Sequence, residues 1–268
     1  MKRTPMRAVT ALAATGLLAV TAAATGYAVD SDAPNYQEFK AATFKDIDGQ
    51  YVVNGDEVAG GERGLRSFYQ EMTAAPSPDG LIINRVYGAD DKWSASQAAN
   101  LTYCVSTKFG SDYTVVKNAM ANGAGQWEGA SSKINFVHAA TQDRSCTTRN
   151  RNVVFSVEPT KTTQYIARAF FPSSPKSSRN VLVNARSLQN SGSWTPSNIM
   201  AHELGHVLGF RHEHTRPEAG TCFEDNNWRP LTAYDSASIM HYPQCNGSSS
   251  DLRMTATDRA GAQSVYGS

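Results

Sequence analysis

The stretch HELGHVLGFRH, residues 202–212, decides the fold class of this 268-residue chain. His202 and His206 are four residues apart, so in a helix they lie on one face and both imidazoles can reach a single metal ion. Glu203 lies about 100° around the same helix from His202. It is close enough there to hold a metal-bound water without binding the metal itself. The stretch therefore predicts a helix that carries two metal ligands and a general base.

A glycine supplies the turn that brings a third ligand to this helix. Gly209 can adopt a left-handed backbone conformation, which ends the helix and redirects the chain so that His212 can offer a third nitrogen. Three neutral imidazoles with an open fourth position are typical of a catalytic zinc site. A histidine-rich helix without metal and a purely structural metal site are the alternatives, but neither requires Glu203 or Gly209. We therefore predict one catalytic Zn²⁺ ion on His202, His206 and His212.

The N-terminal sequence has the layout of a secretory signal. Three basic residues and no acid precede an apolar run over residues 8–20, and small residues follow it up to Ala24. The run is shorter than the ~20 residues that a membrane span needs, which argues against an uncleaved anchor. We therefore predict a signal peptide over residues 1–24, cleaved near Ala24, and a secreted, extracellular protein without membrane attachment after cleavage.

Export favours disulfide bonds for the four cysteines, Cys104, Cys146, Cys222 and Cys245. Four cysteines allow three connectivities. The pairing of Cys104 with Cys146 and of Cys222 with Cys245 is favoured, because each pair encloses a compact stretch of chain. Closing the second loop would stabilise the fold by roughly 3 kcal/mol if the geometry permits.

Charge divides the exported chain into two parts. The full chain has a net charge of +1 and 40% hydrophobic residues, which argues against a disordered protein and against a strongly nucleic-acid-binding one. Residues 25–84 hold ten acidic and four basic side chains, a net charge of −6, whereas residues 85–268 carry +4. A linker with Pro, Ser and Gly over residues 73–80 lies near their junction. We predict a propeptide over residues 25–84, with an approximate boundary, that is attracted to a catalytic domain over residues 85–268.

The catalytic part mixes predicted helices and strands. Apolar residues at helical spacing predict a helix over residues 111–129. Pro196 behind the N-cap Thr195 predicts the start of the histidine-bearing helix, and a capping box predicts a last helix after Thr255. Short β-rich runs predict strands over residues 153–157, 166–171 and 181–183. Together these elements predict an α+β fold.

With a methionine downstream, these residues resemble the metzincin metalloendopeptidases. That family shares the extended His-Glu-x-x-His-x-x-Gly-x-x-His motif and a methionine turn, which here is Ser-Ile-Met-His-Tyr over residues 238–242. This turn and the string Gly-Phe-Arg-His-Glu over residues 209–213 are similar to the astacin branch. By resemblance, Met240 forms an apolar floor under the zinc ligands. Tyr242 would be a fifth metal ligand that swings away to stabilise the tetrahedral intermediate, and a tyrosine hydroxyl can do both.

The resemblance also implies a fold and a way of binding substrate. It extends loosely from Arg85 to the C-terminus and implies a metzincin-like α+β domain. The N-terminal lobe would hold a twisted mixed sheet and the zinc helix, and the irregular C-terminal lobe the methionine turn and a final helix. Residues 166–171 are placed like the family's edge strand, which pairs with an extended protein or peptide substrate. An ordinary half-buried strand is the alternative.

The match to the astacin branch is incomplete. Glu213 is similar to a residue that anchors the mature N-terminus in astacins, but a solvated surface carboxylate is an equal alternative. Residues 214–218 follow the astacin pattern only partly, and the cysteine positions do not allow that family's disulfides to be transferred. The remaining histidines, His138, His214 and His241, are expected to be packed or solvated rather than to bind the metal.

Two short strings in the acidic part invite opposite interpretations. Residues 53–56, Val-Asn-Gly-Asp, resemble the astacin propeptide string Phe-x-Gly-Asp, whose aspartate occupies the open zinc position in the zymogen. Here that residue is Asp56, and a carboxylate there would displace the catalytic water. The alternative is an ordinary turn, for which Asn-Gly-Asp is also common. Residues 46–49, Asp-Ile-Asp-Gly, look like a calcium loop without its bidentate acid, so we discount a calcium site.

The sequence thus predicts a secreted zinc-dependent endopeptidase that is made as a latent zymogen and works as a monomer. Its partners would be a protein or peptide substrate and its own propeptide as inhibitor, with no nucleic acid. Two rival functions remain open: a non-catalytic secreted binding module with a structural zinc, and a zinc hydrolase that acts on a non-peptide bond. The first has no need of Glu203, which favours the enzyme.

Overall fold

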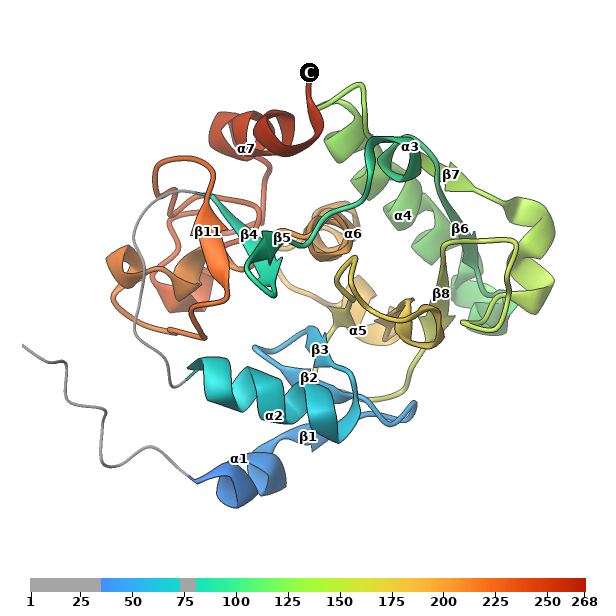
Figure 1. The fold of residues 1–268 in the computed structure, drawn as a ribbon. Coiled ribbons are helices and arrows are strands. Elements are labelled where there is room, and N and C mark those ends of the chain that lie inside the picture. The colour runs from blue at the N-terminus through green and yellow to red at the C-terminus, as the bar shows by residue number, and fades with distance from the viewer. Residues whose placement is uncertain (1–34, 73–80) are drawn as a thin grey trace, which may run out of the picture. The chain divides into compact units, whose positions relative to one another are not determined.

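The computed structural model of the chain describes residues 35–72 and 81–268 (Figure 1). The predicted signal peptide over residues 1–24 and the linker over residues 73–80 lie outside the described residues. Within the described ranges, no helix is long and apolar enough to cross a membrane. Helices are combined with parallel and antiparallel strands, which confirms the predicted α+β class.

The main sheet has five strands in the order β7-β6-β8-β10-β9. Neighbouring strands run parallel except β9, which pairs antiparallel with β10 at one edge. An edge strand leaves one row of backbone groups free to pair with another chain. The strand bounds are β6 Leu101–Val105, β7 Phe136–His138, β8 Phe155–Pro159, β9 Ala167–Arg168 and β10 Asn180–Val183.

Two predicted strands have different bounds in the structure. The strand expected over residues 153–157 begins two residues later, and the one expected over residues 166–171 is confined to β9. After Arg168 the chain leaves its ladder with β10, and the N–H of Ala169 donates to the carbonyl of Asp56 at 3.1 Å. The end of the β-rich run therefore pairs with the N-terminal part of the chain, a partner that local β propensity cannot reveal.

Two long helices pack against each other and share one hydrophobic core with the main sheet. They are α4 (Tyr113–Glu128) and α6 (Pro196–Val207), both close to the predicted bounds. Thr195 caps α6 as predicted, with its side chain accepting from a first-turn N–H. The helices approach closely at Gly123, where a Cβ would lie 2.7 Å from the backbone nitrogen of Ala201. Two shorter helices are α3 Ala95–Ala98 and α5 Ala185–Gln189.

A smaller antiparallel sheet and several tight turns surround the end of α6. The sheet order is β11-β4-β5, with β4 Ile82–Val86, β5 Ala89–Asp90 and β11 Trp228–Pro230. The last helix, α7 (Ala256–Tyr266), begins with the predicted capping box of Thr255 and Asp258. The short 3₁₀ helices are η1 Thr107–Asp112, η2 Ala140–Ser145, η3 Lys176–Ser178, η4 Glu213–Thr215, η5 Pro217–Ala219 and η6 Pro243–Cys245.

Residues 35–72, which we call the N-terminal region, have a small core of their own. Their elements are α1 Tyr36–Ala42, β1 Phe44–Lys45, β2 Tyr51–Val53, β3 Glu57–Ala59 and α2 Gly61–Met72. The three strands form an antiparallel sheet in the order β1-β2-β3. Val52 of β2 packs against Tyr165 and Leu182 of the main sheet's edge. The N-terminal region therefore covers the side of the sheet where β9 lies.

Two disulfides cross-link the catalytic part, and they are the two pairs that the sequence favours because each encloses a compact stretch of chain. Cys104 of β6 bonds to Cys146, and Cys222 bonds to Cys245. The second disulfide ties the loop before β11 to the turn that follows Met240.

Candidate metal centre

Three histidine side chains converge at the C-terminal half of α6. His202 and His206 lie one turn apart on the helix, and the Nε2 atoms of His202 and His212 are 3.1 Å apart. The ring centroids of the three histidines are 4.7 to 5.1 Å from one another. All three side chains are buried. The structure thus brings together the three imidazoles that the spacing of the motif selects.

The return of the chain after α6 depends on Gly209. This residue has φ 98°, in the left-handed region that favours glycine. Its N–H donates to the carbonyl of His206 at 2.8 Å. A Cβ on Gly209 would lie 2.1 Å from the carbonyl oxygen of Asp91, so no larger residue fits without movement of the backbone. The chain reverses here, and His212 comes back to the other two imidazoles.

The donor set fits a metal cation. Each Nδ1 lies 2.7 to 2.9 Å from an oxygen atom, namely the carbonyls of Ile239 and Phe210 and the carboxylate of Glu224. An imidazole that donates from Nδ1 and carries no proton on Nε2 offers the Nε2 lone pair to a metal, so these three side chains can supply three lone pairs to one ion. Among the described residues, the Nε2 of His206 has no hydrogen-bond partner. Three nitrogen ligands held in this way match the preferences of Zn²⁺.

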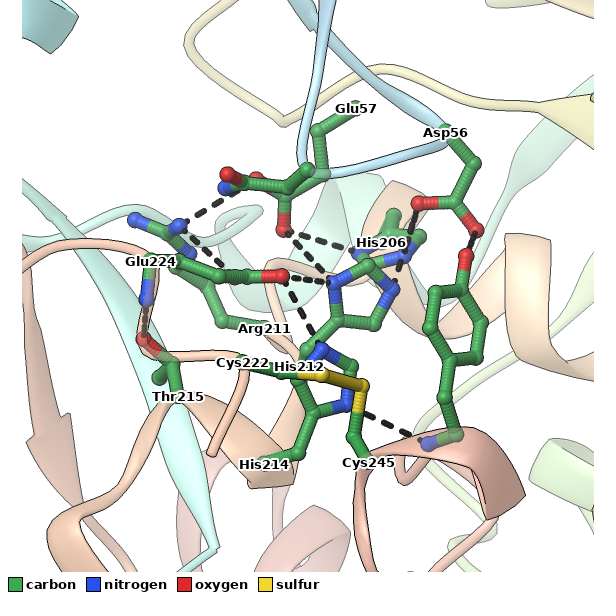
Figure 2. A network of polar contacts seen from close by, with 12 residues as sticks. Asp56, Glu57, His206, Arg211, His212, His214, Thr215, Cys222, Glu224 and Cys245 are labelled. Atoms are coloured by element: carbon green, nitrogen blue, oxygen red, sulfur yellow. Dashed lines mark hydrogen bonds and ion pairs between the residues drawn. A yellow bond between two sulfur atoms is a disulfide. The ribbon is translucent and has the colours of Figure 1, made fainter. Parts of the chain in front are cut away.

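Asp56 of the N-terminal region closes the open side of the histidine cluster (Figure 2). Its carboxylate oxygens lie 3.2 Å from the Nε2 of His202, 3.5 Å from that of His206 and 3.2 Å from that of His212. The four ligand atoms all lie within 4.8 Å of one another. Burial would raise the pKa of Asp56, but His212 and His206 hold it well below its usual value. Asp56 is therefore an ionised fourth group at the cluster.

Glu203 is buried on α6 beside the same cluster, with 2% of its surface exposed. Within residues 35–72 and 81–268, its Oε2 atom has no hydrogen-bond partner. Burial, and then the charge of Asp56, raise the pKa of Glu203 well above its usual value. Burial and the neighbouring Asp56 therefore favour the protonated form of Glu203 in this structure.

The methionine turn lies directly under α6. Met240 is fully buried, and a Cβ on Gly205 would lie 2.4 Å from its Sδ atom, so the helix and the turn touch at this glycine. The ring of Tyr242 stacks on that of His202, with centroids 5.4 Å apart, and lies tilted against that of His212, with centroids 4.5 Å apart. Its hydroxyl donates to Asp56. In this structure, Tyr242 therefore contacts the carboxylate that closes the cluster.

A buried charge network behind His212 is not evident from the sequence. Arg211 pairs with Asp225 at 2.6 Å and with both Glu224 and Glu57 at 3.2 Å. Burial raises the pKa of Glu57 to about 7, because the opposing effect of Arg211 is only partial. Glu224 lies 2.7 Å from the Nδ1 of His212, and a carboxylate in this position commonly orients a metal-binding histidine. The sequence offers one indication of this network, namely Cys222, whose disulfide with Cys245 holds the loop that carries Glu224 next to the methionine turn.

The other candidate residues are placed outside the ligand set. Glu213 is fully buried and accepts from Arg216 at 3.0 Å, so the alternative of a solvated surface carboxylate is wrong. His214 lies 3.1 Å from Glu224, and burial lowers its pKa to about 4. His138 pairs with Asp143, and His241 with Tyr234, as packed histidines do.

A cavity of about 200 Å³ opens beside the cluster. Its lining includes His202 and Glu203 from α6 and residues 164–167 at the start of the edge strand. Trp194 and Tyr242 form part of the remaining wall. The cavity therefore lies between the metal centre and the β9 edge of the main sheet, with Asp56 in its lining.

Comparisons with known proteins give two partial similarities. An alignment of 63 residues is 41% identical to a protein named "Bone morphogenetic protein 1 homolog" from Strongylocentrotus purpuratus, and it covers 16% of this chain and 10% of that protein. The chain thus matches about a tenth of the length of that curated relative. Among solved structures, the "Structure of myroilysin" aligns with a TM-score of 0.44 and 19% identity, over 69% of this chain and 98% of that one.

A family model gives the broader match. The model described as "Dual-action HEIGH metallo-peptidase" matches residues 91–266, which include the whole histidine motif and the methionine turn. The five residues at 202–206 are His-Glu-Leu-Gly-His in this chain. None of these matches assigns the chain to the astacin branch, which stays a resemblance. The chain belongs to the HEIGH metallo-peptidases, a metzincin-type family of hydrolases that act on peptides.

Proposed function

We propose that this metallopeptidase is a secreted zinc endopeptidase made as a latent precursor, in which Asp56 blocks the metal centre. One observation carries the proposal: a carboxylate from the N-terminal region lies 3.2 to 3.5 Å from the three Nε2 atoms that would bind the ion. Asp56 also accepts a hydrogen bond from the hydroxyl of Tyr242. One side chain therefore engages the ligand cluster and the neighbouring hydroxyl at once.

The residues of the catalytic part have distinct roles in peptide hydrolysis. His202, His206 and His212 would hold the ion, and bound zinc would supply a Lewis acid that polarises a carbonyl and makes water nucleophilic near neutral pH. Glu203 accepts the proton of the attacking water and later delivers it to the leaving amine. Once Asp56 has left, the hydroxyl of Tyr242 is free to donate to the oxyanion. Tyr242 therefore changes partner between the precursor and the active enzyme.

The propeptide boundary lies, in this proposal, within residues 73–80. Leu81 is buried, its N–H donates to the hydroxyl of Thr232 at 2.8 Å, and β4 begins at the next residue. β4 lies between β11 and β5, so a cut at residue 84 would sever the middle strand of that sheet. A boundary ahead of Leu81 leaves the sheet whole. It refines the approximate boundary that charge alone predicts.

Secretion and a monomeric state complete the proposal. The signal-like sequence at residues 1–24 supports export, and the two disulfides suit an oxidising compartment. The substrate would be a protein or peptide bound along the edge strand β9. Two rival functions are disfavoured. A binding module with a structural zinc has no use for the buried carboxylate of Glu203, and a hydrolase of a non-peptide bond does not agree with the match to a peptidase family.

The test uses a precursor in which residues 73–80 are replaced by a recognition sequence for a site-specific protease. We expect the cut protein, loaded with zinc, to cleave casein internally, to lose this activity to a chelator and to regain it with Zn²⁺. The uncut protein should be inactive at equal zinc content. Mass spectrometry of the products distinguishes internal cleavage from removal of terminal residues. A cut, zinc-loaded protein that cleaves no peptide bond would reject the proposal.

A further inference from the structure

The guanidinium of Arg168, on the edge strand β9, is completely buried beneath the N-terminal region. Its Nε donates to Asp46 at 2.8 Å, and its Nη2 donates to Asp48 at 2.6 Å. Its Nη1 donates to the side-chain oxygen of Asn180 at 3.0 Å. Two of its three nitrogens are thus satisfied by carboxylates of the N-terminal region and only the third by the catalytic part.

Two further donors of the catalytic part meet the same pair of acids. The hydroxyl of Tyr165 donates to Asp46, and the side-chain nitrogen of Asn180 donates to Asp48 at 3.1 Å. Tyr165 and Asn180 are buried as well. We call Tyr165, Arg168 and Asn180 the Arg168 cradle. It is a preformed set of hydrogen-bond donors around a permanent cation, which is the chemistry that recognises a carboxylate.

A tight turn presents the two acids to the cradle. This is the Asp-Ile-Asp-Gly string for which the sequence analysis discounts a calcium site. Gly49 has φ 83°, and its N–H donates to the carbonyl of Asp46 at 2.9 Å. Burial would raise the pKa of Asp48, but Arg168 and hydrogen-bond donors lower it overall, so the carboxylate is ionised at neutral pH. The turn therefore places two carboxyl side chains in the cradle.

The cradle remains with the catalytic part when the N-terminal region leaves. All three residues follow the proposed boundary by more than eighty positions. Among the described residues, Arg168 has hydrogen bonds to Asp46, Asp48 and Asn180. Loss of the two aspartates would leave it with the hydrogen bonds to Asn180. A guanidinium that has lost two carboxylates in a partly desolvated site favours a new carboxylate over water.

The position of the cradle on the edge strand ties it to the path of a substrate. The N–H of Ala169 donates to the carbonyl of Asp56 rather than to β10. Ala167 and Arg168 both lie opposite residues of β10, and the backbone groups of an edge strand point alternately toward and away from its neighbour, so the outer edge of β9 can pair with an added chain. A chain added along this edge places one of its side chains next to that of Arg168 on the same sheet face.

We propose that the Arg168 cradle is a carboxylate-binding subsite, filled by the propeptide in the precursor and by an acidic side chain of the substrate in the processed enzyme. The inference rests on the proposed peptidase function and adds a substrate class to it, namely peptides with an aspartate or glutamate near the scissile bond. The net charge of +4 on residues 85–268 suits such substrates. Arg168 acts here as a specificity-determining residue.

The first experiment measures cleavage by the processed enzyme. A fluorogenic peptide with one fixed scissile bond carries Asp at each position in turn, and each Asp peptide is paired with its isosteric Asn peptide. We expect kcat/KM to favour Asp over Asn by about 10-fold or more at one position, since charge-assisted hydrogen bonds are roughly twice as strong as neutral ones. Equal values at every position would overturn the subsite and leave the peptidase function standing.

Matched variants assign the preference to the cradle. In Arg168→Gln, the ratio of Asp to Asn cleavage should fall to about one, and in Tyr165→Phe, which keeps the ring, it should fall by a few-fold. Arg186→Gln removes the same charge from an exposed site on α5 and should keep the full ratio. An unchanged ratio in both cradle variants would overturn the inference.

A binding measurement separates this inference from the proposed function. The probe is a capped peptide with the sequence of residues 45–50, compared with a version in which both aspartates are asparagine. Calorimetry on the processed protein needs no turnover, so it reads the cradle even if no peptide bond is cleaved. We expect the Asp peptide to bind at least 10-fold more tightly than the Asn peptide, and Arg168→Gln to abolish the difference. Equal binding of the two peptides would overturn the cradle as a carboxylate site.

Discussion

The N-terminal region meets the catalytic part with several carboxylates, and two of these contacts, at Asp56 and at the pair Asp46 and Asp48, differ in kind. At the metal centre, Asp56 faces imidazole nitrogens whose free lone pairs suit a metal ion. At the sheet edge, Asp46 and Asp48 meet the permanent cation of Arg168. In the proposed precursor, the first contact blocks the metal centre and the second holds the region in place. The difference teaches that blocking and anchoring can be tested separately, because they rest on different side chains.

The largest effect is expected at the metal centre itself. In the processed enzyme, Glu203→Gln should lower kcat/KM by about 10²- to 10⁴-fold, because an amide cannot accept the proton of water. Zinc content and thermal stability should be retained, because Glu203 is not a predicted ligand. The exposed carboxylate of Glu218 provides the control, and Glu218→Gln should keep full activity. Peptide cleavage at the unaltered rate by Glu203→Gln would remove this residue from the mechanism.

The next effect tests blocking against anchoring in the uncut precursor. Asp56→Ala should raise peptide cleavage by at least about 10-fold over the unaltered precursor, since losing one partner of a buried charged contact costs about 2–5 kcal/mol. Substitution of both Asp46 and Asp48 by Asn should raise it less, because the block at the metal centre stays. Rates are compared at equal zinc content. Equal latency of all three precursors would show that neither carboxylate contact restrains the enzyme.

A third effect concerns the network behind the ligands. Glu224→Gln should weaken zinc binding by about 10- to 100-fold, because the carboxylate that fixes the Nδ1 proton of His212 is replaced by a neutral group. Competition with a fluorescent chelator measures the affinity, and Glu218→Gln is again the control. Unchanged affinity would mean that the backbone alone orients His212.

The smallest effect is the pH dependence of the anchor. The pKa of Asp48 is lowered from 3.8, because Arg168 and hydrogen-bond donors outweigh the effect of burial. Its contribution to stability is therefore present above about pH 4 and is lost as the pH falls through the lowered value. The Tm difference between the unaltered precursor and Asp48→Asn should be constant from pH 7 to pH 5 and shrink below pH 4. A difference that grows on acidification would contradict this sign.

The two contacts also differ in how far the sequence predicts them. His202, His206 and Gly209 lie within eight residues, so helix periodicity and one glycine conformation are enough to place them. Asp56 could be named only through its resemblance to a propeptide string. The pairing of Arg168 with Asp46 joins residues 122 positions apart, and no local pattern marks it.

The errors in the predicted elements have the same cause. The β-rich run at residues 166–171 has the propensity of a longer strand, but Ala169 bonds to Asp56 rather than to a strand of the main sheet. Glu213 could be assigned to the surface or to a buried site, and its partner Arg216 lies in the following turn. Glu224 is a similar case. It reaches His212 because the disulfide between Cys222 and Cys245 holds its loop near the metal centre. Tertiary contacts decide these positions, and local sequence patterns do not report them.

Leu81 shows what a cut at the proposed boundary changes. The chain re-enters the catalytic part at this residue, whose N–H is held by Thr232 and whose carbonyl accepts from Leu231. In the proposed precursor the N-terminal region is an intramolecular ligand, and a connection of only eight residues would keep its effective concentration in the millimolar range. After a cut, the same carboxylates must compete at the concentration of the free fragment. If the protein is secreted as proposed, dilution of the released fragment would then favour the active enzyme, without any change in the contacts themselves.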